Sequence, residues 1–185
     1  MFIQTEPTPN PATLKFLPGR TVIASGTANF TEAETAARLS PLAERLFSLP
    51  EVTGVFLGAD FITVTKDGAG DWYQLKPAIL AVIMEHFTAG RPVLLAAPDG
   101  TVAEASQEDE DEVVSQIKEL LETRVRPAVA NDGGDIVFHG FRDGVVSLHM
   151  RGACAGCPSS TATLRNGIEN LLRHFCPDVQ EVRAV

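Results

Sequence analysis

Two of the three cysteines of the chain, Cys154 and Cys157, lie three positions apart. They follow an alternating apolar run over residues 145–150 and adjoin a helical pattern over residues 158–175. Pro158 suits the first position of that helix, where its missing N–H costs nothing. The positive end of the helix dipole then favours thiolate over thiol at this cysteine pair. Because thiolates are metal ligands, the pattern predicts a metal site at a strand-to-helix junction.

One Cys-x-x-Cys pair supplies half of a usual ligand set, because tetrahedral zinc and iron–sulfur clusters normally take four ligands. His139 and His149 have no spacing to the cysteines that matches a zinc-binding pattern, and we interpret both as sheet-surface residues. A second copy of the chain, related by a two-fold axis, would bring the number of thiolates to four. Two facing pairs could then hold one exposed iron–sulfur cluster between subunits.

Three segments around the cysteines resemble one known family. They are Asp132-Gly133-Gly134-Asp135, the segment 152–160 (GACAGCPSS) and the segment 163–169 (TLRNGIE). Together they are similar to the C-terminal domain of NifU and of Nfu-type proteins. The resemblance implies a non-enzymatic iron–sulfur cluster scaffold or carrier, with Cys154 and Cys157 as the metal ligands. It also implies a [4Fe-4S] cluster that is shared between the two subunits of a homodimer.

The family resemblance extends to the start of the chain and to partners. Residues 8–11 (TPNP), followed by a Lys-Phe pair at 15–16, are similar to the N-terminal domain that accompanies the cysteine domain in many Nfu proteins. The implied partners are upstream cluster-assembly machinery as donor and apo iron–sulfur proteins as acceptors, and the homodimer is expected to form on cluster binding.

Two other functions use the same cysteine pair. A thiol–disulfide oxidoreductase also carries Cys-x-x-Cys at a helix N-terminus, but the aromatic residue common before that motif and a preceding βαβ pattern are absent here. A structural zinc shared between two chains is the second alternative. It would stabilise a domain without a core of its own, whereas this chain has apolar stripes enough to fold without metal.

Composition excludes several other classes of protein. The net charge of −9 argues against nucleic-acid binding, which needs clustered Lys and Arg. The longest apolar run, residues 78–84, is far shorter than the ~20 residues that cross a bilayer. Three cysteines are too few for a disulfide framework, which indicates a reducing compartment. With neither a secretory nor a transit-peptide pattern at residues 1–6, we predict a bacterial cytoplasmic location, and a mature organelle-matrix form as the alternative.

The expected elements form two small α+β domains, each a short sheet packed against helices. The N-terminal domain, 1–95, is predicted to contain four strands (2–5, 13–17, 52–57 and 61–65), helices over 41–48 and about 75–87, and a loop over 24–35. A flexible linker is expected over 96–111, because residues 96–112 hold seven acids and no Lys or Arg. The C-terminal domain, 112–185, is predicted as a helix over 113–128, a hairpin (136–141 and 145–150), a helix over 158–175 and a strand over 179–185.

Several residues of the C-terminal domain have specific expected roles. A three-residue hairpin loop, 142–144, would place Ile136 and Phe138 on one apolar face with alternate residues of the second strand. Asp132 and Asp135 are expected in turn and capping roles rather than as metal ligands. Cys176 is expected to be a small buried residue at a helix end, outside the cluster site.

Overall fold

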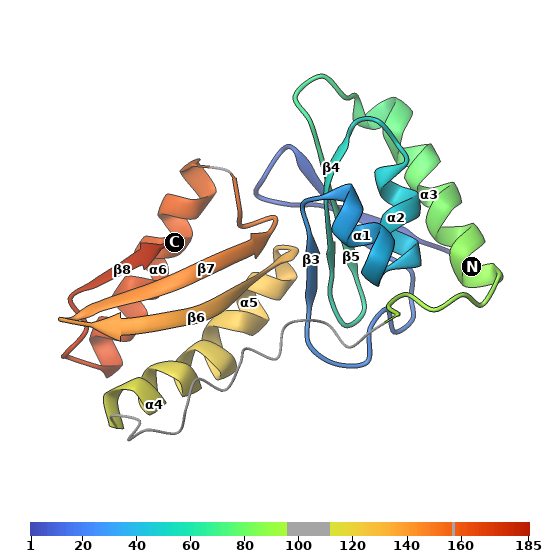
Figure 1. Ribbon diagram of the computed structural model, residues 1–185. Coiled ribbons are helices and arrows are strands. Elements are labelled where there is room, and N and C mark those ends of the chain that lie inside the picture. Colours follow the sequence, from blue (N-terminus) through green and yellow to red (C-terminus); the bar gives the residue numbers. More distant parts are fainter. Residues whose placement is uncertain (96–111, 157) are drawn as a thin grey trace. The chain divides into compact units, whose positions relative to one another are not determined.

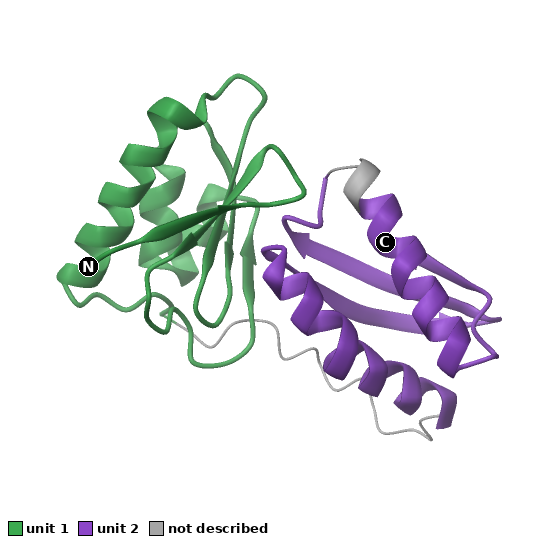
Figure 2. Cartoon of the chain, turned by 180° about the vertical axis from the view of Figure 1, so that it is seen from behind, with its two compact units in different colours: residues 1–102 green, residues 103–185 purple. Residues whose placement is uncertain are grey.

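The computed structural model describes residues 1–95, 112–156 and 158–185, and Figure 1 shows its helices and strands. The chain divides into two compact units, Met1–Val102 and Ala103–Val185 (Figure 2). Each unit has its own sheet packed against helices. The predicted fold class, two small α+β domains, is therefore confirmed. The predicted linker over 96–111 lies outside the described residues.

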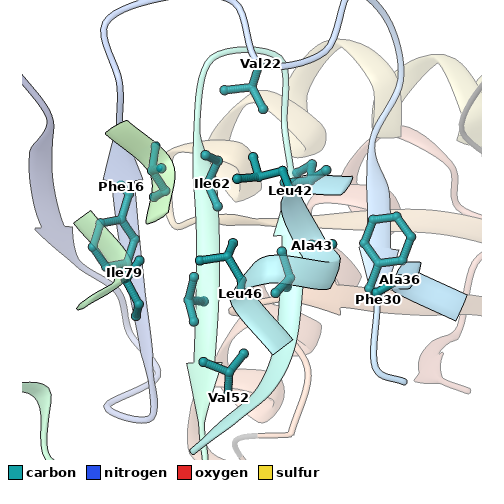
Figure 3. Close-up of a cluster of buried hydrophobic side chains, with 14 of the residues drawn as sticks. Phe16, Val22, Phe30, Ala36, Leu42, Ala43, Leu46, Val52, Ile62 and Ile79 are labelled. Carbon is teal, nitrogen blue, oxygen red and sulfur yellow. The ribbon is translucent and has the colours of Figure 1, made fainter. Parts of the chain in front are cut away.

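The first unit is built on an antiparallel sheet with strand order β1-β2-β5-β4-β3. Its elements are β1 (Gln4–Pro7), β2 (Thr13–Leu17), β3 (Ala28–Phe30), α1 (Ala33–Leu39), α2 (Pro41–Phe47), β4 (Val52–Leu57), β5 (Ile62–Lys66) and α3 (Trp72–Thr88). Figure 3 shows Phe16 and Ile62 of the sheet beside Leu42 and Leu46 of α2 and Ile79 of α3. All five side chains are fully buried in one core.

Local signals explain α2 but not the elements before it. The Ser40 side chain accepts a hydrogen bond from the Ala43 N–H at 3.0 Å, and Pro41 occupies the first turn of the helix predicted over 41–48. The predicted loop over 24–35 is wrong, because β3 lies within this range and α1 begins in it. The three residues of β3 form a strand only through pairing with β4, a contact that local sequence does not encode.

The second unit has a three-stranded sheet with order β6-β7-β8. Its elements are α4 (Glu112–Leu120), the π-helical turn η1 (Leu121–Val125), α5 (Arg126–Asn131), β6 (Gly134–Arg142), β7 (Val145–Gly152), α6 (Pro158–Phe175) and β8 (Glu181–Ala184). β6 and β7 are antiparallel, whereas β8 runs parallel to β7 and is connected to it through α6. Side chains from α4, α5, α6 and all three strands share one buried core.

The helix predicted over 113–128 is distorted where Pro127 requires it. Proline has no N–H and its ring clashes with the carbonyl group four residues earlier, here that of Thr123. The widened π turn η1 lies just before Pro127 and contains Thr123, so the chain passes the proline without ending the helix.

The predicted hairpin loop of three residues is wrong. Arg142 pairs with Val145, which leaves a two-residue turn of Asp143 and Gly144. Both turn residues have positive φ, 51° and 78°, as in the type I′ turn that matches the twist of a hairpin.

The apolar face predicted for the hairpin is nevertheless present. A register shift between Phe138 and Gly140 adds one residue to β6, so that Phe138 pairs with Leu148 and Ile136 pairs with Met150. The bulge compensates for the shorter turn, so Ile136 and Phe138 are still paired with the apolar residues of β7.

Candidate metal centre

Cys154 lies in the loop that connects the end of β7 to the start of α6. Its side chain is only 5% exposed and belongs to the core of the second unit. The Thr161 hydroxyl donates a hydrogen bond to the Cys154 carbonyl oxygen at 3.0 Å, which fixes the loop to the first turns of α6. Cys157 lies outside the described residues, and the roles of both cysteines as ligands stay predictions.

Gly134, at the start of β6, makes room for the Cys154 sulfur. A Cβ atom at position 134 would lie 2.6 Å from Cys154 Sγ and 2.7 Å from the Arg151 carbonyl oxygen. The neighbouring Gly133 has φ of 82°, and its carbonyl oxygen accepts a hydrogen bond from the Ala153 N–H at 3.2 Å. The two glycines of the Asp-Gly-Gly-Asp segment therefore position the cysteine loop, one through its backbone conformation and the other through close approach.

The prediction that the helix dipole favours a thiolate is wrong for Cys154. Burial raises the pKa of its thiol to about 12, and the negative charges of Asp132 and Asp135 add to the shift. Cys154 precedes the first residue of α6, and the dipole acts mainly within the first helical turn. Desolvation therefore wins, and the cysteine is a neutral thiol at pH 7 when it holds no metal.

A buried ion pair supports the strand that approaches Cys154. Asp135 is 3% exposed, and its two carboxylate oxygens accept hydrogen bonds from Nε and Nη2 of Arg126, both at 2.9 Å. The Asp135 carboxylate also accepts from the Ile136 N–H at 2.8 Å. The expected turn role is confirmed for Asp132 at the C-terminal cap of α5, but it is wrong for Asp135, which joins α5 to β6. The sequence gives no signal that Arg126 is its partner.

The remaining candidates are not part of the cysteine loop. His139 and His149 are exposed on the sheet, as predicted, and His149 Nδ1 lies 2.8 Å from the Val185 carbonyl oxygen. Cys176 follows α6 and is 1% exposed, which confirms its expected buried position. In the parts of the chain that the structure describes, no group of three or more His, Cys, Asp or Glu side chains could hold a metal ion.

Two family models match the chain, one in each unit. The model "Scaffold protein Nfu/NifU N terminal" matches residues 3–90, and the model "NifU-like domain" matches residues 117–183, which include the cysteine loop. The chain belongs to the Nfu/NifU family. The predicted family is thereby confirmed for both parts of the chain.

Relatives of this Nfu-family chain align with all of its residues. The proteins named "NFU1 iron-sulfur cluster scaffold homolog, mitochondrial" from Drosophila virilis, Drosophila sechellia and Homo sapiens are 49%, 51% and 50% identical to it. The chain spans 62% and 65% of the length of the two fly proteins and 72% of the human protein.

The predicted bacterial cytoplasmic location is wrong. The relatives at 49–51% identity over the full chain are named mitochondrial, which points to mitochondria instead. The packing of folded domains does not specify a compartment, and a low cysteine content suits any reducing one, so the evidence used for that prediction could not separate the two. No helix in the described ranges is long and apolar enough to cross a membrane.

Proposed function

We propose that this Nfu-family protein holds an iron–sulfur cluster as cargo and passes it to apo-proteins, without catalysing a reaction of its own. The observation that carries the proposal is the Cys154 loop, which Gly134 and Thr161 position between a strand and a helix. The family match and the names of the relatives, which are cluster scaffolds, support the same function. Cys154 and Cys157 are the proposed ligands, and both belong to the Cys-x-x-Cys pair.

We further propose a [4Fe-4S] cluster shared between two copies of the chain. Such a cluster is normally held by four thiolates, and one Cys-x-x-Cys pair supplies two. A two-fold axis would present the same pair from each subunit and complete the set. The two subunits would then stay together only while the cluster is bound.

The raised pKa of Cys154 suggests how loading and release are balanced. A cysteine binds metal as thiolate, so cluster loading must remove the Cys154 proton. The Cys154 side chain must also become more exposed to reach the cluster. When an acceptor's own thiolate replaces Cys154 at an iron atom, the freed sulfur takes up a proton and returns to its buried position. Gly152 and Gly156, with φ of 65° and 79°, flank the part of the loop that has to move.

We propose that the two domains divide this work. Residues 112–185 would hold the cluster, residues 1–95 would form a separate domain, and residues 96–111 would link them. Cluster-assembly machinery would act as donor and apo iron–sulfur proteins as acceptors. The names of the relatives support a mitochondrial location.

Anaerobic reconstitution with iron and sulfide tests the proposal. We expect about two irons per chain in a dimer that separates when the metal is removed, as a shared four-iron cluster requires. Cys154→Ala and Cys157→Ala should each lose the iron, whereas the control Cys176→Ala should keep it. A normal cluster in the Cys157 variant would refute the ligand assignment.

The same experiment separates the alternatives. An oxidoreductase would bind no iron and form a reversible disulfide between Cys154 and Cys157. The structure weighs against it, because the first cysteine of such a pair needs a lowered pKa for attack and that of Cys154 is raised. A shared structural zinc would give a colourless protein, whereas a bound iron–sulfur cluster is brown.

A further inference from the structure

An open groove adjoins the cysteine loop in the second unit. It has a volume of about 600 Å³ and is lined by the loop, the first turns of α6 and β8, through Gly156, Thr161, Ala162, Arg165, Glu181, Arg183 and Ala184. Thr161 is also the residue that hydrogen-bonds the Cys154 carbonyl oxygen. A molecule in this groove would therefore lie beside the loop that holds Cys154.

The groove carries a net positive charge in a chain whose net charge is −9. The acid among its described lining residues, Glu181, already accepts hydrogen bonds from Arg183 through both carboxylate oxygens, at 3.0 and 3.2 Å. Arg165 is the remaining cation, and its Nε atom is buried without a hydrogen-bond partner among the described residues. A buried donor without a partner is costly, so Arg165 is suited to an anionic acceptor brought by a ligand.

The backbone of β8 supplies a second donor at the same place. β8 is an edge strand of the described sheet, and on its outer side the Val182 N–H donates to the Glu169 carboxylate of α6 at 3.1 Å. Alternate residues of a strand direct their N–H groups to the same edge, so that of Ala184 lies on the outer side too. On α6, Arg165 lies one helical turn before Glu169, and on β8, Ala184 lies two residues after Val182. A ligand carboxylate beside Arg165 can thus accept a hydrogen bond from the Ala184 N–H, just as the Glu169 carboxylate accepts one from the Val182 N–H.

We propose that this groove binds an acidic segment of the protein that receives the cluster, with one carboxylate between the Arg165 guanidinium and the Ala184 N–H. The inference rests on the proposed function and adds the chemistry of the partner. An extended peptide is the favoured ligand, because the edge of β8 can hydrogen-bond a peptide backbone while Arg165 selects its charge. Such docking would place an acceptor's cysteine next to Cys154.

The test is an NMR titration of the full apo chain with a blocked hexapeptide that contains Asp-Glu-Asp and one Cys. We expect saturable amide shifts at Thr161, Ala162, Arg165 and Ala184. A matched Asn-Gln-Asn peptide should give none. Arg165→Gln should raise the dissociation constant at least about tenfold, the effect of losing one hydrogen bond between charged groups.

The control variant is Arg173→Gln, which removes a cation from the same helix outside the groove and should leave peptide affinity unchanged. Equal affinity of the wild type and Arg165→Gln, shifts confined to other surfaces, or equal competition by inorganic phosphate would overturn the proposal. The titration requires no cluster. A chain that binds the peptide but loads no iron would refute the proposed function alone. A chain that loads iron but does not bind the peptide would refute only the proposed role of the groove.

Discussion

Burial, rather than the neighbouring helix, sets the chemistry of Cys154. Its thiol is 5% exposed and its pKa is raised to about 12. Because this value lies above that of an unfolded cysteine, the folded state keeps a proton that the unfolded chain releases as the pH rises past 9. The stabilisation from this residue is complete below pH 9 and is lost between pH 9 and 12.

Alkylation of Cys154 should show the raised pKa directly. In a Cys157→Ala/Cys176→Ala variant, Cys154 is the only thiol, so its rate with iodoacetamide can be followed alone. We expect the rate to rise about tenfold per pH unit from pH 7 to 10 without levelling, because thiolate is the reacting form. The denatured variant serves as the control and should level near pH 9. Levelling of the folded variant below pH 8 would contradict the assignment.

Gly134 should tolerate no side chain. A Cβ at this position would lie 2.6 Å from Cys154 Sγ. We expect Gly134→Ala to lower the free energy of unfolding by about 1–3 kcal/mol, as overpacking does, and to lower iron loading as well. Gly140→Ala is the matched control in the same strand, since a Cβ there meets no atom within 4 Å. Equal iron loading and stability in the two variants would show that Gly134 is not needed to position Cys154.

At the scale of elements, one buried ion pair joins α5 to β6. Asp135 is 3% exposed and holds Arg126 with two hydrogen bonds, whereas the similar pair of Glu181 and Arg183 is largely exposed on β8. We expect Asp135→Asn to lower the free energy of unfolding by about 2 kcal/mol, because the partly buried guanidinium of Arg126 then keeps only the more exposed Glu122 as its charged partner. Urea unfolding of the control Glu181→Gln should be nearly unchanged, because an exposed ion pair contributes little to stability. A similar small change in both variants would show that the buried pair does not stabilise the junction.

Short-range signals account for the elements that they control. The Ser40-Pro41 start of α2 and the effect of Pro127 on its helix depend on residues within one turn. The strand β3, the bulge after Phe138 and the ion pair of Arg126 depend on residues distant in sequence, so a single sequence does not specify them.

The same distinction holds at the site. The spacing of Cys154 and Cys157 and the motif of residues 132–135 identified the family, which the comparisons confirmed. The position of Gly134 against the sulfur and the burial of Cys154 follow from the packing of three elements. Because burial decides the pKa of this thiol, the thiolate expected from the sequence is wrong for Cys154, whereas its role as a ligand stays a prediction.

At the scale of the whole molecule, the two units have separate cores. Among the described residues, the apolar cluster of the first unit, with its partly buried neighbours, ends at Leu94, and that of the second begins at Val113. The described members of the two clusters are different residues, so each unit has its own source of hydrophobic stabilisation.

Separate cores predict that residues 112–185 fold without the rest of the chain. We expect this fragment to unfold cooperatively, with a midpoint within about 4 °C of its transition in the full chain, which corresponds to a free-energy difference below about 1 kcal/mol. Calorimetry of the fragment, of residues 1–95 and of the full chain measures all three transitions. A fragment 112–185 that is unfolded at 25 °C, or a full chain that melts in one transition above both fragments, would show that the first unit stabilises the second. If the fragment folds and also loads iron, the cluster ligands lie within the second unit and the first is free to contact partners.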